Sequence, residues 1–180
     1  MSNFASAAGS HRPSRASQLT AFGRGTERYD VVVVGAGAAG LMCAIEAGKR
    51  GRRVLVLEHA DRVCKKILIS GGGRCNFTNL SAIPSDYQSE NPYFCISALA
   101  RYTPQDFIDL VEKHRILYHE KKLGQLFCDG ASQEIVQMLF AECQSGAVTI
   151  KTSCKVISIH CDKVFSTDTN LGVVVSDTLV

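Results

Sequence analysis

Hydrophobic residues in the first part of the chain form two short apolar runs separated by a helical stretch. Val31–Val34 are continuous β-branched residues, which is typical of a strand buried on both faces of a sheet. An alanine-rich helix follows and runs to about Arg50, where Gly51 ends it. Arg53–Leu57 predict the second strand. Strand, helix and strand in this order indicate a βαβ unit of an α/β fold.

Two further helices are predicted by apolar residues spaced three and four positions apart. Thr103, followed by Pro104 and Asp106, has the features of a helix start, and Ser132 precedes the second helix. The two apolar faces consist of Phe107, Leu110, Val111 and His114, and of Ile135, Val136, Leu139, Phe140 and Cys143.

From residue 147 onward the hydrophobic pattern changes to a period of two. Val148 and Ile150 alternate with polar residues, and Val156–Ile159 and Val173–Val175 form the next apolar stretches. The polar turns between them predict three short strands in an antiparallel meander.

Composition agrees with one globular domain. The 180 residues are 46% hydrophobic and 21% charged, and the formal net charge of +3 says little about partners. No apolar run approaches the length of a membrane-spanning helix, so no membrane association is expected.

Residues 1–28 differ in composition from the rest. They are rich in serine, alanine and glycine, carry arginines, and contain no acidic residue before Glu27. They show no helical or strand period, which predicts a disordered N-terminal extension before a domain over residues 29–180. Arg- and Ser-rich tails with few acids are also typical of organelle transit peptides, although a harmless extension or a misplaced start codon is favoured.

The eight cysteines are scattered along the chain. No CxxC pair occurs, and no cysteine and histidine cluster has the spacing of zinc ligands. We therefore expect reduced thiols in a cytoplasmic protein and no metal site.

The turn after the first strand carries a phosphate-binding fingerprint, Gly35-x-Gly37-x-x-Gly40. Gly35 makes the tight turn, Gly37 lets the backbone approach a pyrophosphate, and Gly40 lets the helix pack close to the strands. The helix begins at Ala38 and Ala39 and directs its free N–H groups and positive dipole end at the phosphates.

An acidic residue stands at the end of the second strand. Glu58 lies 18 positions after Gly40, where a carboxylate accepts a hydrogen bond from the adenosine ribose. The same carboxylate repels a 2′-phosphate, so the pattern predicts FAD or NAD rather than NADP. The spacing alone does not separate FAD from NAD.

The stretch KKILISGGGRCNFTN contains three consecutive glycines, which cost backbone entropy and bury no side chain. The stretch resembles the signature of the YhiN-like flavoproteins, the BaiN/RdsA group of FAD-dependent oxidoreductases. That signature is a lysine, an apolar run and SGGGRCNxTN. The matching residues are Lys66, Ser70, Gly71, Gly72, Gly73, Arg74, Cys75, Asn76, Thr78 and Asn79. The resemblance therefore implies FAD.

The resemblance also implies roles for these residues. Gly71–Gly73 would let the main chain lie against the flavin, and bare amides there would tune the cofactor. Arg74 would be a charge partner for phosphate or flavin, or a clamp on the loop. Asn76, Thr78 and Asn79 would bond the flavin or cap the loop backbone.

The roles of Val156 and Cys75 each have two interpretations. Val156 matches the position at which two-dinucleotide-binding flavoproteins contact adenine through the backbone, and sheet core is the alternative. Cys75 suggests a redox disulfide, but no second cysteine has the required spacing, so a packed thiol is favoured.

The resemblance covers nearly everything after residue 28 but less than half of a full-length family member, and it is similar to the gammaproteobacterial branch. Cys64 and Arg115 depart from that branch, where glycines are usual. It implies a Rossmann-like two-dinucleotide-binding FAD domain, with a parallel sheet, helices and a β-meander, truncated before its last strand. We expect this N-terminal fragment to bind FAD weakly and to be inactive alone.

For the whole protein, the resemblance implies hydride transfer through flavin N5. The substrate would be a small molecule with an activated C=C bond or uridine in large-subunit ribosomal RNA, with NAD(P)H as candidate reductant. No catalytic residue is assigned, since His114 and His119 are better explained as structural or solvated.

Two other function classes stay open. One is an NAD-binding dehydrogenase module, and the other is a non-catalytic nucleotide-binding or RNA-binding protein. Basic residues are spread out and not interleaved with aromatics on one surface, which argues against RNA binding by this part alone.

Overall fold

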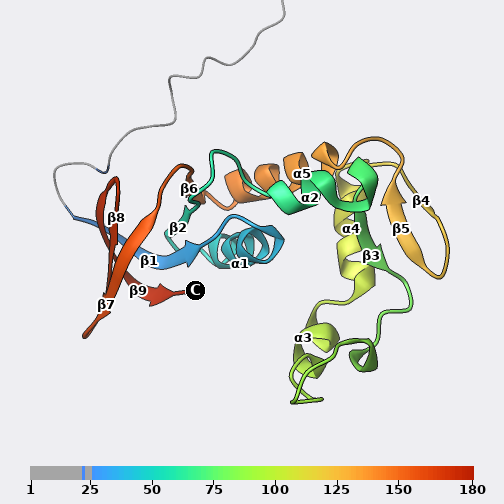
Figure 1. Ribbon diagram of the computed structural model, residues 1–180, viewed down its shortest axis with the longest axis horizontal. Helices are drawn as coiled ribbons and strands as arrows, with labels where there is room; N and C mark the ends of the chain where they lie inside the picture. The colour runs from blue at the N-terminus through green and yellow to red at the C-terminus, as the bar shows by residue number, and fades with distance from the viewer. Residues whose placement is uncertain (1–21, 23–25) are drawn as a thin grey trace, which may run out of the picture.

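Two aliphatic strands lie side by side within the main sheet. In the computed structural model, which describes residues 22 and 26–180, β1 (Glu27–Val34) and β2 (Val54–Leu57) pair in parallel, with Val31 opposite Val54. Helix α1 (Ala38–Lys49) connects them (Figure 1). The predicted βαβ unit is therefore confirmed, and β2 is buried along its whole length.

The predicted disordered extension, residues 1–28, lies outside the described residues over 1–21 and 23–25. Phe22 is buried and packs with the second hydrophobic cluster defined below, and β1 begins at Glu27.

Six strands form the main sheet, in the order β6-β2-β1-β9-β8-β7. Strand β6 (Thr149–Lys151) runs parallel to β2, with Leu55 opposite Thr149. The sequence placed this segment in the antiparallel meander, and that assignment was wrong. Its partner is 94 positions away at Leu55, and the alternation of apolar residues carries no information on so distant a pairing.

The meander consists of β7 (Val156–Cys161), β8 (Phe165–Thr169) and β9 (Gly172–Leu179), which pair antiparallel. Strand β8 was not predicted, because its sequence FSTDT has no apolar alternation. Strand β9 joins the meander to the parallel part, since it pairs antiparallel with β8 and parallel with β1. The α/β fold with a meander is confirmed.

A second sheet of three antiparallel strands, in the order β3-β5-β4, lies beside the end of α5 (Figure 1). Its strands are β3 (Asn76–Asn79), β4 (Tyr118–Glu120) and β5 (Gln125–Cys128). The sequence did not predict this sheet, because its strands are short and lack a clear alternation.

The remaining helical elements are α2 (Lys65–Ile69), the 3₁₀ turns η1 (Ser70–Gly73) and η2 (Pro84–Asp86), α3 (Ile96–Arg101), α4 (Pro104–Lys113) and α5 (Gln133–Ser145). Of these, α2 with η1 and then α5 connect the two sheets, whereas η2, α3 and α4 lie between β3 and β4 of the second sheet in chain order. The predicted start of α4 is confirmed, because the Thr103 side chain accepts a hydrogen bond from the Asp106 amide and the Asp106 carboxylate accepts one from the Thr103 amide. Figure 1 shows α3 on a segment that projects from the rest of the molecule.

Hydrophobic side chains pack on both faces of the parallel strands. Val54 and Val56 face the cluster beneath α1 and α5, whereas Leu55 and Leu57 face a second cluster on the other side. The first cluster includes Val33, Leu41, Ile45, Val111, Ile135 and Leu139, and the second includes Phe22, Tyr29, Val32, Cys154 and Val174. The α1 side is where the fold brings the predicted site residues together.

Among the residues that the structure describes, no helix is both long and apolar enough to cross a membrane. Within the same residues, no group of three or more cysteine, histidine, aspartate or glutamate side chains could hold a metal ion.

Candidate functional site

The turn after β1 brings the helix α1 very close to the strand. The Gly35 amide donates to the Leu57 carbonyl over 2.7 Å, which fixes the turn against β2. A Cβ atom on Gly40 would lie 2.0 Å from the carbonyl oxygen of Gly35, so only glycine fits there. In contrast, a Cβ on Gly37 would meet nothing within 4 Å. The turn is therefore tightly packed at Gly40, whereas the backbone at Gly37 is accessible to a ligand.

The start of α1 is electrostatically suited to an anion. Gly37 is the N-cap and provides no side-chain cap, and the first turn of the helix contains no acidic residue. The amides of Ala38 and Ala39 lie at the start of this 12-residue helix, where the helix dipole is positive, and no acidic side chain of the first turn neutralises it. Both residues are exposed, as contact with a ligand phosphate requires.

The buried carboxylate of Glu58 lies beside this turn. Its Oε2 accepts a hydrogen bond from the Ala36 amide and its Oε1 accepts one from the Ala60 amide, both at 2.8 Å. The Nδ1 of His59 is 3.0 Å from Oε1. These contacts hold the carboxylate that the sequence predicted as the acceptor for the ribose.

A cavity of about 430 Å³ extends from this turn. The predicted residues Gly37, Ala38, Glu58 and Lys66 line it. Its other lining residues include His59, Arg62, Lys65 and Ile67, which the sequence had not singled out. Arg62 and Lys65 both pair with Asp61, whereas Lys66 has no carboxylate partner within the described residues. The cavity therefore combines the start of α1, the carboxylate of Glu58 and the ammonium group of Lys66, which forms no ion pair within the described residues.

The SGGG turn follows α2, which includes the predicted apolar run. Gly71, Gly72 and Gly73 have φ values of 58°, 68° and 88°, a region that favours glycine. A Cβ on Gly71 would lie 2.7 Å from the Phe127 ring, but one on Gly72 or Gly73 would meet nothing within 4 Å. Packing against Phe127 thus requires a glycine at position 71, whereas the backbone at Gly72 and Gly73 is accessible to a ligand.

Hydrogen bonds from other elements hold this turn. The Ser132 amide donates to the Gly73 carbonyl at 2.7 Å, and the Cys75 amide donates to the Ser70 carbonyl at 3.1 Å. Ser132 directly precedes α5, as predicted, but its side chain does not cap the helix. Its Oγ donates to the Leu68 carbonyl and so ties the start of α5 to α2.

A second cavity, of about 280 Å³, continues the first, because Ala38, Lys66 and Ile67 line both. Asn76 lines it, together with apolar residues of α1, α4 and α5: Met42, Phe107, Ile135 and Leu139. The helical period of the sequence marked Phe107, Ile135 and Leu139 only as core. The cavities together form one path from Glu58 to the SGGG turn.

The other predicted residues lie next to this path. Gly71–Gly73 and Arg74 form the turn beside the second cavity without lining it, and Arg74 is exposed and has no ion-pair partner in the described part of the chain. Asn76, Thr78 and Asn79 line a third cavity, of about 400 Å³.

Val156 is separate from the three cavities. Its side chain packs against the second hydrophobic cluster, in agreement with the sheet-core interpretation. Two residues before Val156, the Cys154 amide donates to the Glu58 carbonyl at 2.9 Å.

The two histidines weighed as catalytic bases are bound to carboxylates. His114 Nε2 is 2.8 Å from Glu142 Oε1, and His119 Nδ1 is 2.6 Å from Asp129 Oδ1. Neither histidine lines the three cavities. Their contacts support the structural interpretation.

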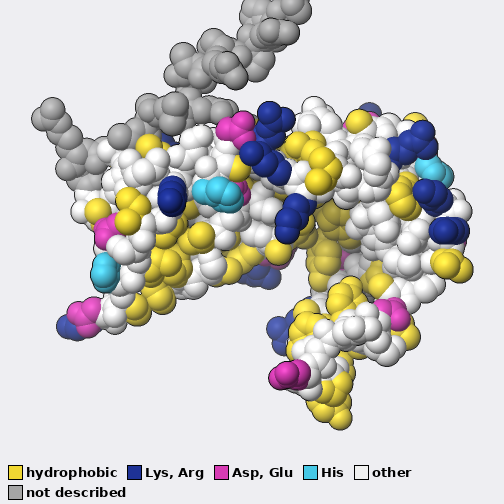
Figure 2. Space-filling view, in the orientation of Figure 1, with side chains coloured by type: hydrophobic (Ala, Val, Ile, Leu, Met, Phe, Trp, Pro, Cys, Tyr) yellow, Lys and Arg dark blue, Asp and Glu magenta, His cyan; other side chains and the backbone are white. Residues whose placement is uncertain are grey.

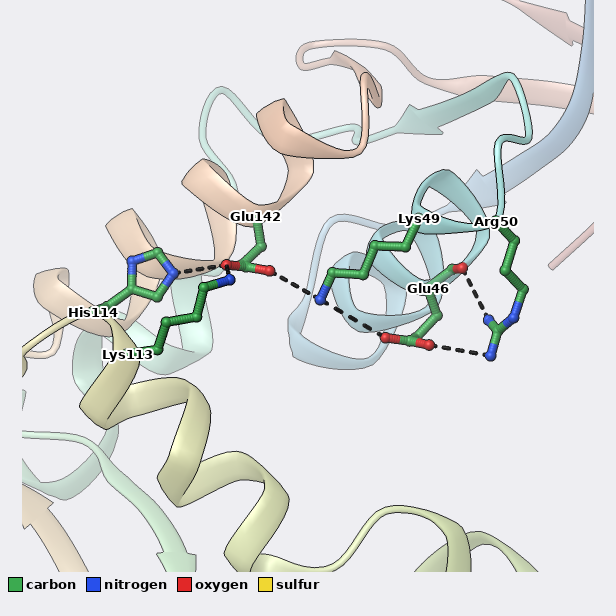
Figure 3. Close-up of polar contacts among 6 residues, drawn as sticks. All are labelled: Glu46, Lys49, Arg50, Lys113, His114 and Glu142. Atoms are coloured by element: carbon green, nitrogen blue, oxygen red, sulfur yellow. Dashed lines mark hydrogen bonds and ion pairs between the residues drawn. The ribbon is translucent and has the colours of Figure 1, made fainter.

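Glu142 is the centre of an ion-pair cluster that also includes Lys49 and Lys113 (Figure 3). Burial raises the pKa of Glu142, but hydrogen bonds from Lys113, His114 and Lys49 outweigh that effect and lower it to about 2. The cluster joins α1, α4 and α5 behind the cavities.

Cysteines near the path are buried thiols. Burial raises the pKa of Cys75, and it raises that of Cys64 to about 11 and that of Cys128 to about 12. All cysteines of the described residues are free. A thiolate is therefore scarce at neutral pH, which agrees with packed rather than redox-active thiols.

The sequence matches the profile of the HI0933-like protein Rossmann domain over residues 29–180. It is 54% identical over 145 residues to the ribosomal RNA dihydrouridine synthase of Escherichia coli K12, covering 80% of this chain and 36% of that protein. It is 50% identical over 129 residues to the protein of the same name from Haemophilus influenzae, covering 72% of this chain and 32% of that protein. The chain thus spans about a third of the length of these relatives.

Among solved structures, the glycine oxidase of Geobacillus kaustophilus superposes with a TM-score of 0.62 at 16% identity. The match covers 86% of this chain and 55% of that one. This likeness supports the Rossmann-type fold and carries no information on substrate.

Proposed function

The chain belongs to the HI0933-like family, whose Rossmann domain it carries, and from this premise we propose that it is the FAD-binding part of a flavin-dependent oxidoreductase. The observation that carries the proposal is the path of two joined cavities from Glu58 to Asn76. An extended dinucleotide needs such a path, with a ribose acceptor at one end and open backbone along it.

The residues present fit FAD. Glu58 would accept the hydrogen bonds of the adenosine ribose, and the open backbone at Gly37 with the start of α1 would hold the pyrophosphate. Lys66 lines both cavities and would neutralise phosphate charge between them. The open amides at Gly72 and Gly73 would lie at the flavin end. Val156 would contribute a backbone contact to the adenine.

Bound FAD would supply hydride transfer at its N5 atom. The chain's own residues would position the cofactor and exclude water from one side of it. Met42, Phe107, Ile135 and Leu139 provide an apolar wall at the second cavity, and an apolar wall protects a reduced cofactor from solvent.

For the substrate we propose uridine in large-subunit ribosomal RNA, reduced at its 5,6 double bond to dihydrouridine. Two relatives at 54% and 50% identity carry the name ribosomal RNA dihydrouridine synthase, which supports this choice. The reaction belongs in the cytoplasm, where ribosomes are available, and NAD(P)H is the proposed source of electrons. Because this chain spans only a third of those relatives, the proton donor is left unassigned.

The cofactor is tested first, on the protein in its natural length. The visible spectrum is recorded before and after heat release, and the released compound is chromatographed beside FAD. Flavin bands that co-elute with FAD support the proposal. A colourless protein that takes up no FAD on reconstitution would overturn it in favour of the NAD-binding alternative.

The reaction is tested separately, by mass spectrometry of nucleosides from ribosomal RNA. A bacterial strain that lacks its own ribosomal RNA dihydrouridine synthase is complemented with this protein. Restored dihydrouridine is the expected result. FAD binding without restored dihydrouridine would reject the substrate and keep the flavoprotein.

A further inference from the structure

The third cavity, of about 400 Å³, adjoins the proposed flavin end, because Asn76, Phe77 and Phe107 line both it and the second cavity. It lies between β3, the segment of η2 and α3, and the start of α4. Its volume falls in the range of small-ligand sites. Its position would bring a bound ligand next to the reacting end of the cofactor.

Aromatic rings form much of its wall. The Phe77 and Phe107 rings contact each other at a centroid distance of 6.0 Å, and Phe77 also meets Tyr118 edge-on. Tyr87 and Tyr102 are 44% and 37% exposed and make no ring contact among the described residues. Two tyrosines of one cavity thus have ring surface left for a ligand, and Figure 2 shows hydrophobic side chains gathered on the projecting part of the molecule that carries α3.

The polar groups of this wall match the edge of a uracil base. The side-chain amide of Asn76 is oriented so that its nitrogen donates to the carbonyls of Thr78 at 3.1 Å and Leu126 at 3.2 Å. In this orientation its Oδ1 is left as an acceptor. Such an acceptor suits the N3–H of uracil. The hydroxyls of Thr78 and Tyr102 make no hydrogen bond within the described residues and can donate to O2 and O4.

The hydroxyl of Tyr102 remains a donor at neutral pH. Burial, followed by the nearby carboxylates of Asp106, Glu46 and Glu142, raises its pKa. Cytosine presents an acceptor at N3, which the Oδ1 acceptor of Asn76 would oppose, although the hydroxyls could accept from its N4 donor. The wall therefore favours uracil over cytosine.

The β4–β5 turn, which carries two lysines, contacts one residue of the cavity wall. Asn79 donates through Nδ2 to the Leu123 carbonyl at 3.0 Å, which places the β4–β5 turn with Lys121 and Lys122 beside it. Neither lysine pairs with a carboxylate in the part of the chain that the structure describes, although Lys121 Nζ lies 4.9 Å from the centre of the Phe127 ring. Figure 2 shows Lys and Arg side chains over β4 and β5.

Two carboxylates, in η2 and in the first turn of α4, accept hydrogen bonds from backbone amides. Asp106 caps α4 and Asp86 accepts from the Ile83 amide at 2.9 Å. Their charge would repel a phosphate, so a nucleotide would place its phosphates towards Lys121 and Lys122.

We propose that this third cavity is a pyrimidine subsite, which binds one uridine of single-stranded RNA with its base between the tyrosines and its phosphates at the β4–β5 turn. The inference rests on the proposed function, because it names the subsite of that RNA substrate. Single-stranded RNA is read in this way, by stacking on aromatic rings and by hydrogen bonds to the base edge. The sequence argued against RNA binding by this part, because its basic residues are spread out and not interleaved with aromatics on one surface. In the structure, Tyr87 and Tyr102 line the cavity, and Lys121 and Lys122 belong to the turn that Asn79 of its wall contacts.

The test measures RNA binding apart from catalysis. Tyr87→Leu and Tyr102→Leu are compared with Tyr93→Leu, which removes a 75% exposed tyrosine of the same projecting segment that does not line the cavity. Each protein, in its natural length and loaded with FAD, is titrated into a short 5′-labelled oligouridylate and the fluorescence anisotropy is followed. Thermal unfolding and the flavin spectrum verify that every variant is folded and loaded.

We expect Tyr87→Leu and Tyr102→Leu to raise Kd about 10-fold, the effect of losing one stacked base, and Tyr93→Leu to leave it within about 2-fold. Oligocytidylate should bind more weakly than oligouridylate to the wild type. Equal losses in all three variants, no loss in the first two, or no binding by the wild type would each overturn the subsite.

The outcomes separate the two proposals. If dihydrouridine is not formed but oligouridylate binding depends on Tyr87 and Tyr102, the subsite stands and the proposed reaction fails. If dihydrouridine is formed while both variants bind and react like the wild type, the reaction stands and the subsite is wrong.

Discussion

The carboxylate of Glu58 accepts a hydrogen bond from the amide of Ala36, with 2.8 Å between Oε2 and the nitrogen. This contact connects the end of β2 to the turn after β1. The second oxygen is fixed by the Ala60 amide. The acid is therefore held in place by two backbone donors, and a dinucleotide would meet a preorganised acceptor rather than a mobile side chain.

Replacing Glu58 tests this preorganisation. Glu58→Gln keeps the shape but substitutes an NH₂ donor for one of the two acceptor oxygens. We expect FAD affinity to fall roughly 10- to 100-fold, because a hydrogen bond to a charged group contributes about 1.5–3 kcal/mol. Titration of the apoprotein with FAD, followed by flavin fluorescence, gives the Kd.

Glu90→Gln is the matched control for that measurement, because Glu90 is exposed and accepts no hydrogen bond among the described residues. Its FAD affinity should equal that of the wild type. If Glu58→Gln also binds FAD like the wild type, the carboxylate has no part in holding the nucleotide.

Two glycines of the same turn should give opposite results when changed to alanine. Gly40→Ala puts a methyl group 2.0 Å from the Gly35 carbonyl, so α1 must move away from β1. We expect the free energy of unfolding to fall by about 2–3 kcal/mol, as for other overpacked sites. Urea denaturation followed by circular dichroism measures it.

Gly37→Ala meets nothing within 4 Å and has an ordinary φ of −79°. Its stability should stay within about 0.5 kcal/mol of the wild type. Its FAD affinity should nevertheless fall, because the added methyl fills the space that a pyrophosphate would need. Unchanged FAD binding by a stable Gly37→Ala protein would contradict the proposed position of the phosphates.

The sequence predicts the parts of the molecule that depend on local spacing. The β-branched run, the glycines at 35, 37 and 40 and the acid at 58 lie within one βαβ unit, so their order along the chain is also their order in space. The SGGG turn is recognisable for the same reason, since the positive φ values at Gly71–Gly73 are a local demand on residue type.

What the sequence does not predict depends on pairing between distant segments. Strand β6 alternates like a strand of a meander, and only its parallel contact with β2 shows its place in the sheet. The sheet β3-β5-β4 unites residues 76–79 with residues 118–128. The wall of the third cavity combines β3 of that sheet with the segment that follows it up to α4, so Thr78, Tyr87 and Tyr102 could not be grouped from their spacing.

Thiol labelling tests the interpretation of the cysteines. Burial raises the pKa of Cys75, and that of Cys128 to about 12, whereas Cys161 is exposed. Brief treatment of the native protein with iodoacetamide at pH 8 should modify Cys161 and leave Cys75 and Cys128 unmodified. Peptide mass mapping reads the result, with the denatured protein as the control in which all are modified. Rapid native labelling of Cys75 would restore the redox interpretation.

The ion-pair cluster at Glu142 should make stability depend on pH. Glu142 is 2% exposed, and its Oε1 accepts from Lys113 at 2.7 Å while Lys49 Nζ lies 2.9 Å from Oε2 (Figure 3). His114 faces the same carboxylate from α4, and Tyr102 lies near it. Removing this charge leaves the cations of α1 and α4 facing each other.

Glu142→Gln should therefore lower the free energy of unfolding at pH 7 by about 2 kcal/mol, as expected for lost hydrogen bonds to a charged group. The folded-state pKa, about 2, lies below the ordinary value of 4.5, so the stabilisation is complete above about pH 5 and is lost as pH falls through 4.5 towards 2. Denaturation of both proteins between pH 7 and pH 3 should show the difference between them shrinking with acid. Glu90→Gln, which removes an exposed charge, should show no such convergence. A difference between wild type and Glu142→Gln that stays constant down to pH 3 would mean that shape, and not the charge of Glu142, stabilises the contact between α4 and α5.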